Sequence, residues 1–423
     1  MTQPLPAALF NKNRAKLQNK LTKKSLAIFF SNHKMPKNGD VFYPYRQNSD
    51  LIYLTGINQP ETILILGPDI EILFIKKPDE MHMLWEGDLL DKEQATNISG
   101  IEKICWEDQF ISVIDKALKE KKHIYFNTGQ KLNQSEIETK DEIFLSRFRQ
   151  EYPFHSTRSV RPLMEELRLH KEHEETDQIR KGIEVTHKAF DSILQALKPG
   201  VNEKTLEAIL RYEFLMQGSE GPAYDPIIAS GKNACVLHYT KNNSACPDGG
   251  LLLMDIGAEI NNYASDISRT VPVNGKFTKR QKECYQAVLD VMEKTINIIR
   301  PGIRLAELNK KTKEWLIEKH LELGLYKKSE LEQEDLAKKY FPHGVSHFIG
   351  LDVHDCGNKN TILKEGMVIS CEPGLYIPEE NIGIRIEDDI LVGEPSVNLS
   401  EKIPKNADEI ERLTGSKKHA NKN

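Results

Sequence analysis

Two short apolar runs in the second half of the chain each end in a carboxylate. Residues 251–254 lead into Asp255, and residues 366–371 lead into Glu372. An apolar run of this length is typical of a buried strand, which delivers the acidic side chain at its end. Each of these acidic side chains is therefore expected at the end of a buried strand.

The first part of the chain reads as an α/β domain. Apolar runs predict strands at 26–30, 61–66, 70–75 and 123–126, and apolar residues at helical spacing predict an amphipathic helix over 107–121. The character changes between residues 146 and 182, where a charged stretch leads into a long amphipathic helix. We place the boundary near residue 168, so that the predicted domains are 1–168 and 169–423.

The second domain is expected to mix helices with its strands. Helices are predicted over 203–216, 278–299 and 305–323, and Pro-Gly stop signals follow two helices at 199–200 and 301–302. Two helix–Pro-Gly–helix units about 100 residues apart fit either two related halves or coincidence. The predicted fold class is α/β (α+β).

Composition excludes several functional classes. The 58 basic and 63 acidic residues leave a net charge of −5, whereas a dedicated nucleic-acid binder usually shows a basic face. No apolar run reaches the ~18 residues of a membrane span, and the N-terminus lacks the pattern of a secretory signal. Six cysteines without a Cys-x-x-Cys pair favour free thiols in a reducing compartment, so we expect a cytoplasmic protein.

Asp255 and a second aspartate further along the chain could lie on the same face of a hairpin. Asp266 follows eleven residues later, in a second strand-like stretch. A hairpin that turns near Asn261 and Asn262 would bring both carboxylates together. The alternative is one surface aspartate and one turn aspartate, and spacing alone does not separate the two readings.

Histidines cluster further along the chain. His343, His347 and His354 fall within twelve residues, although the whole chain has only 13 histidines. Their β-leaning, glycine-broken surroundings favour a site over isolated histidines. In the run 382–391, alternation predicts one strand with Arg385 and Glu387 on the same face, for which a salt-bridged surface strand is the alternative.

Taken together, these segments offer a hard, oxygen-rich set of ligands. Four carboxylates and one imidazole suit Mn²⁺, Mg²⁺, Fe²⁺ or Co²⁺ better than a structural zinc, which favours thiolate and imidazole. Four acids can hold two divalent ions if some of them bridge, and two-metal sites activate water for hydrolysis. The set is Asp255, Asp266, His347, Glu372 and Glu387.

These segments resemble, in order, the signature of the metallopeptidases with the pita-bread fold, and within that group aminopeptidase P. The resemblance covers nearly the whole chain and includes 46–56, 225–239, 253–276, 343–355, 372–376 and 383–389. It implies an N-terminal creatinase/aminopeptidase P-like α/β domain followed by a pita-bread catalytic domain.

The resemblance implies a role for each ligand. Asp255 would bind one metal ion, His347 and Glu372 the other, and Asp266 and Glu387 both. Two divalent ions are implied, with Mn²⁺ as the first choice and Co²⁺, Fe²⁺ or Zn²⁺ as alternatives. Glu372 would also accept a proton from the attacking water.

Further residues match positions around the metals. His238, His343 and His354 match the histidines that line the family's substrate site and support the reaction, and Tyr376 and Arg385 match positions beside the metals.

An aromatic residue of the first domain is also implied. Trp85 matches an aromatic that reaches a substrate pocket in the oligomer, which would be a homo-dimer or homo-tetramer.

The implied activity is that of an Xaa-Pro aminopeptidase, which releases the first residue of peptides with proline in second position. Prolidase, which cleaves only Xaa-Pro dipeptides, has the same ligands and the same two-domain plan. Methionine aminopeptidase shares the ligands but usually lacks the first domain. A non-catalytic binding module is disfavoured because all five ligands are retained.

Overall fold

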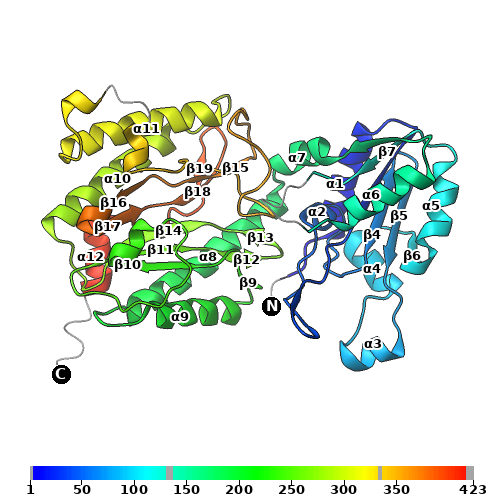
Figure 1. Cartoon of the computed structure of the whole chain (residues 1–423), viewed down its shortest axis with the longest axis horizontal. Helices are drawn as coiled ribbons and strands as arrows, with labels where there is room; N and C mark the ends of the chain where they lie inside the picture. The colour runs from blue at the N-terminus through cyan, green and yellow to red at the C-terminus, as the bar shows by residue number, and fades with distance from the viewer. Residues whose placement is uncertain (1–2, 130–136, 332–335, 416–423) are drawn as a thin grey trace. The chain divides into compact units, whose positions relative to one another are not determined.

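The computed structural model describes residues 3–129, 137–331 and 336–415. The chain divides into two compact units, Pro4–Arg168 and Leu169–Asn423 with Met1–Gln3. Each unit mixes helices and strands (Figure 1). No helix within the described ranges is long and apolar enough to cross a membrane.

The unit Pro4–Arg168 is built on a six-stranded sheet in the order β6-β5-β4-β1-β7-β8. The pairs β1–β4 and β4–β5 are antiparallel, and the other neighbours are parallel. The strands are β1 Ser25–Phe30, β4 Ile63–Gly67, β5 Ile70–Ile75, β6 Ile104–Trp106, β7 His123–Phe126 and β8 Ser156–Ser159. The four strands predicted for this unit are confirmed, with bounds that shift by two residues or fewer.

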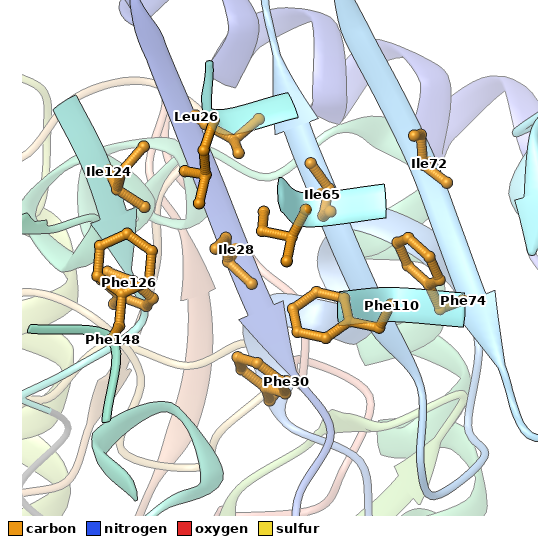
Figure 2. Packing of buried hydrophobic residues seen from close by; sticks show 12 residues of the cluster. Leu26, Ile28, Phe30, Ile65, Ile72, Phe74, Phe110, Ile124, Phe126 and Phe148 are labelled. Atoms are coloured by element: carbon orange, nitrogen blue, oxygen red, sulfur yellow. The ribbon is translucent and has the colours of Figure 1, made fainter. Parts of the chain in front are cut away.

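An apolar core covers one face of this sheet. Leu26, Ile28 and Phe30 of β1 belong to one buried cluster with Phe110 of α5, which contacts Phe30 (Figure 2). Phe110 meets Phe74 edge to face, with ring centroids 5.4 Å apart. The helices of this unit are α1 Ala7–Lys20, α2 Ser49–Thr55, α3 Glu80–Trp85, α4 Lys92–Ser99, α5 Phe110–Leu118, α6 Lys140–Glu151 and α7 Arg161–Leu169.

In the unit Leu169–Asn423, long helices pack in pairs. Helix α8 packs against α9, and α10 packs against α11. The prediction for 203–216 matches α9, and the other two predicted helices are confirmed to within one residue. The helices are α8 His173–Ala196, α9 Glu203–Met216, α10 Lys279–Ile298, α11 Leu305–Glu322 and α12 Ala407–Gly415.

Small antiparallel sheets of this unit present the acidic residues. Strand β11 lies between β10 and β14, and β15 pairs with β18 (Figure 1). The hairpin between Asp255 and Asp266 is confirmed, because Asn261 and Asn262 make its turn with φ of 50° and 65°. The strands are β9 Gly221–Pro222, β10 Ile227–Ser230, β11 Leu251–Ile256, β12 Ala258–Ile260, β13 Tyr263–Ala264, β14 Ile267–Pro272, β15 Val368–Cys371, β16 Gly374–Ile377, β17 Ile382–Arg385, β18 Asp388–Leu391 and β19 Val397–Asn398.

The prediction of one strand over 382–391 is wrong, and the segment 343–355 is less regular than a strand. The segment 343–355 has a series of bends and one isolated bridge, from Phe348 to Ile369. The run 382–391 is two strands, β17 and β18, interrupted at 386–387. Both strands are buried almost throughout, so the surface-strand alternative is also excluded.

Candidate active site

One pocket of the unit Leu169–Asn423 brings most of the candidate residues together. Its cavity volume is about 350 Å³. Nine of the eleven residues singled out in the sequence line it, together with Leu237, Gly344 and Ser346. The nine are His238, Asp255, Asp266, His343, His347, His354, Glu372, Arg385 and Glu387.

Strand ends place the carboxylates around this pocket. Asp255 lies near the end of β11, opposite Ser268 of β14. Glu372 follows β15, and Glu387 precedes the paired strand β18. The carboxylates therefore come from the margins of two antiparallel sheets, as the apolar runs that end in acids predict.

Three ligand atoms form the centre of the cluster. The donor atoms of Asp266, His347 and Glu387 all lie within 4.8 Å of one another. Nε2 of His347 is 3.3 Å from Oδ2 of Asp266, 3.6 Å from Oε1 of Glu372 and 3.9 Å from Oε1 of Glu387. Asp255 joins this group through Tyr224, whose hydroxyl lies 2.7 Å from Oδ1 of Asp255 and 2.5 Å from Oδ1 of Asp266.

The electrostatics of the cluster favour a positive charge among the carboxylates. Burial raises the pKa of Glu372 to about 7, against the opposing charges of His347 and Arg385. Burial raises the pKa of Glu387 well above its usual range, and the charges of Asp266 and Glu372 raise it further. Burial and the charge of Asp255 raise the pKa of Asp266. A cation among these acids would relieve their repulsion, and carboxylate and imidazole donors fit divalent ions.

The protonated ring of His347 can itself supply positive charge among the carboxylates. Burial alone would lower the pKa of His347, but its hydrogen bond to Asp266 and the charge of Glu372 raise that pKa to about 9. An imidazolium is therefore favoured at neutral pH between the carboxylates. A metal ion would have to displace this proton, because only a neutral imidazole can be a ligand.

A chain of hydrogen bonds runs from Asp255 to His343. Arg385 donates from Nη2 to Oδ2 of Asp255 at 2.5 Å, from Nε to Ser268 at 2.8 Å and from Nη1 to the Tyr376 hydroxyl at 2.8 Å. That hydroxyl lies 2.8 Å from Nε2 of His343. Tyr376 is thus next to the site, although it is not among the residues that line the pocket.

The partners of His343 define its protonation. Its Nδ1 lies 2.7 Å from the carbonyl oxygen of Gly344, so Nδ1 carries the hydrogen and Nε2 accepts from Tyr376. Burial and the charge of Arg385 lower the pKa of His343 to about 3. His343 is therefore a neutral residue that orients its neighbours.

The other two candidate histidines face the pocket differently. The His354 ring meets the His347 ring edge to face, with centroids 4.3 Å apart. Burial lowers the pKa of His354 to about 4, and the charge of His347 adds to this effect. A neutral His354 can donate a hydrogen bond into the pocket. His238 lines the same pocket but is exposed.

Trp85 lies outside this group. It ends α3 in the unit Pro4–Arg168 and is 77% exposed. Its contribution to a substrate pocket in an oligomer stays a prediction.

Sequence reasoning missed two residues that contact the cluster. Tyr224 precedes the motif 225–239 and touches two carboxylates, yet no local pattern distinguishes it from an ordinary tyrosine. Asp389 is fully buried, and its Oδ2 accepts a hydrogen bond of 3.1 Å from the backbone N–H of Asp266. Its place two residues after Glu387, in a run of three acids, was the available signal.

Comparisons with known proteins agree with this geometry. A family model described as metallopeptidase family M24 matches residues 177–394, and one described as the aminopeptidase P N-terminal domain matches residues 10–125. The Xaa-Pro aminopeptidase of Escherichia coli is 35% identical to this chain over 96% of it and 97% of that protein.

Solved structures show the same likeness. A Zn-substituted E. coli aminopeptidase P in complex with product has a TM-score of 0.90 and 32% identity, covering 98% of this chain and 99% of that one. Proline aminopeptidase P II from Yersinia pestis has a TM-score of 0.89 and 33% identity, covering 97% and 99%. These findings confirm the expected fold class and the resemblance to aminopeptidase P. The chain belongs to metallopeptidase family M24, with an aminopeptidase P N-terminal domain before its catalytic part.

Proposed function

We propose that this protein is an Xaa-Pro aminopeptidase, a metal-dependent hydrolase that releases the first residue of peptides with proline in second position. The observation that carries the proposal is the convergence of four carboxylates and one imidazole in a single pocket. The likeness to the E. coli Xaa-Pro aminopeptidase over nearly the full chain supports the specificity for proline.

The ligand roles are part of the proposal. Asp255 would hold one divalent ion, His347 and Glu372 would hold the other, and Asp266 and Glu387 would contribute to both. When bound, the two ions supply Lewis-acid polarisation of water and of the scissile carbonyl. Oxygen-rich donors favour Mn²⁺, with Co²⁺, Fe²⁺ and Zn²⁺ as alternatives, and a relative has been solved in a Zn-substituted form.

The side chains divide the remaining work. Glu372, which lines the pocket with Oε1 3.6 Å from Nε2 of His347, would accept a proton from the attacking water. His354 and His238 donate hydrogen bonds to the scissile carbonyl and to the tetrahedral oxygen that develops from it. The substrate amine lies near Asp255, which Arg385 holds, and this placement restricts cleavage to the first residue.

We also propose that the two compact units correspond to domains 1–168 and 169–423. The protein would act as a homo-dimer or homo-tetramer in which Trp85 reaches a substrate pocket. Exposed apolar side chains on α3 support self-association, since large exposed patches mark contact surfaces. These side chains are Met81 (65%), Met83 (50%), Leu84 (78%) and Trp85 (77%). The six free cysteines support a cytoplasmic location.

A paired cleavage assay tests the function. Metal-free protein is reconstituted with Mn²⁺ and offered a tripeptide with proline second, the matching Xaa-Pro dipeptide and the same tripeptide with alanine second. We expect release of the first residue from the proline tripeptide above both others. A preference for the dipeptide would instead identify a prolidase, and a preference for the alanine peptide would reject specificity for proline.

A further inference from the structure

Asp355, the residue after the pocket-lining His354, belongs to a buried ion pair. Nζ of Lys171 is 2.9 Å from Oδ2 of Asp355, and each side chain is 1% exposed. Removing two charges from water costs so much free energy that such pairs add little net stability. The position of this pair therefore calls for an explanation other than stability.

Lys171 is held at a rigid point of the fold. It lies directly before the N-cap residue Glu172 of the long helix α8. Its backbone N–H donates to the carbonyl oxygen of Gly366 at 2.9 Å. The ammonium group is therefore presented from a fixed helix end.

Asp355 closes the loop that carries His354. Its backbone N–H donates to the carbonyl oxygen of Phe348 at 2.8 Å, which joins the two ends of the segment 348–355. Within this loop, Gly350 accepts a hydrogen bond of 2.8 Å from the backbone of Ala264.

The ion pair packs directly against this loop. A Cβ atom at Gly350 would lie 2.0 Å from Oδ2 of Asp355 and 2.9 Å from Cε of Lys171. Glycine, which has no Cβ atom, is therefore the residue that fits at position 350 against the ion pair. Replacing either Lys171 or Asp355 would therefore change the packing against the backbone of the loop at Gly350.

We propose that Lys171 and Asp355 are positioning residues, whose ion pair holds the loop 348–355 so that His354 meets the reacting carbonyl. This inference deepens the proposed function and rests on its assignment of His354. His354 lines the pocket and contacts His347. A hydrogen-bond donor must sit within a few tenths of an ångström of its productive place, so a loosened loop lowers the rate before it lowers binding.

The primary test is Lys171→Met in the full-length, metal-reconstituted protein. We expect kcat to fall roughly 10- to 100-fold while KM changes by less than about threefold. The reason is that a displaced His354 would lose a hydrogen bond that it makes in the transition state. Metal content should equal that of the wild type. Lys171→Arg, which keeps the charge, should recover part of the lost rate.

A second variant separates positioning from stability. In Lys171→Met/Asp355→Leu, the pair becomes apolar, and such replacements commonly restore stability. We expect a recovered melting temperature with kcat still low. As a matched control, Arg168→Met removes a buried ion pair with Asp50 in the other compact unit, where both side chains are 3% exposed. It should lower the melting temperature and leave kcat unchanged.

A readout without substrate completes the test. Amide hydrogen exchange of the metal-free protein should rise in residues 348–357 of Lys171→Met and stay at the wild-type level in the helix pair α10–α11. Wild-type kcat in Lys171→Met, loss of metal together with rate, or full rate in the double apolar variant would each overturn the proposal. If wild-type protein cleaved no proline peptide, the proposed function would fail, whereas unchanged exchange in the loop would refute the positioning role.

Discussion

The hydroxyl of Tyr224 lies 2.5 Å from Oδ1 of Asp266. The same hydroxyl is 2.7 Å from Oδ1 of Asp255, yet a phenol has one hydrogen to donate. The charges of the two acids add to burial in raising the pKa of Tyr224 well above its ordinary value. Tyr224 therefore stays protonated, donates its hydrogen to one of the two carboxylates and remains in contact with the other.

This link leads to the first prediction, for Tyr224→Phe. Removing the hydroxyl frees both carboxylates to move apart, so we expect affinity for Mn²⁺ to weaken roughly tenfold, as is common for residues that orient metal ligands. Competition with a fluorescent chelator measures the change. Tyr212→Phe, at a residue that is 60% exposed on α9, is the matched control. Unchanged affinity in Tyr224→Phe would show that the carboxylates hold their positions without it.

The proposed bridging carboxylates allow a sharper test. We expect Asp266→Ala and Glu387→Ala to abolish turnover and to lower the metal content of the purified protein, because each removes a ligand of both ions. Elemental analysis and the proline tripeptide assay measure the two effects. Asp408→Ala, which removes a surface partner of Lys282, should keep both metal and rate. Full activity in either bridging variant contradicts the assignment.

His354 is predicted to serve the rate and not the metals. We expect His354→Ala to retain its metal content and to lose roughly 100- to 1000-fold in kcat, the usual effect of removing one donor to a developing oxyanion. Steady-state kinetics and elemental analysis on the same preparation decide the matter. A collapse of metal content would instead make His354 part of the metal centre.

Metal binding should depend on pH. Below pH ~7 Glu372 holds a proton, since burial raises its pKa to about 7, and the pKa of about 9 at His347 keeps that ring protonated. A metal must displace these protons, so we expect affinity for Mn²⁺ to rise from about pH 6 to about pH 8. Calorimetry in buffers of different ionisation enthalpy should record proton release. A fall in the affinity for Mn²⁺ with rising pH would contradict this prediction.

Much of the fold could be predicted from local sequence. Strand β5 and helix α9 match their predicted ranges because each carries its own apolar periodicity and stop signals. The hairpin that joins Asp255 to Asp266 could be predicted because Asn261 and Asn262 tolerate the positive φ that its turn requires.

Local sequence could not predict contacts between residues that lie far apart along the chain. Gly350 packs against the ion pair of Lys171 and Asp355, two residues that are 184 positions apart. Tyr224 gains its importance from Asp266, 42 residues away. Periodicity reports which face of an element is apolar, and it carries no information about such partners.

A buried histidine far from the pocket provides the last prediction, which concerns stability. His320 of α11 is 1% exposed and packs edge to face against Tyr326 and Tyr340, with centroids 5.6 and 5.9 Å away. Within the described part of the chain, neither ring nitrogen has a hydrogen-bond partner. Burial lowers the pKa of His320 to about 4.

The sign of the effect follows from the two states of the chain. Between pH ~6.5 and pH ~4 the unfolded chain protonates this ring and the folded chain does not, so stability is lost as the pH falls through that window. A pKa difference of about 2.5 corresponds to about 3 kcal/mol in all, of which about 2 kcal/mol is lost by pH 5. We expect His320→Phe to be less sensitive to acid by this amount, measured by urea unfolding at pH 7 and pH 5. His173→Phe, at an exposed histidine, should follow the wild type, and equal acid sensitivity in all three proteins would mean that His320 is protonated in the folded state.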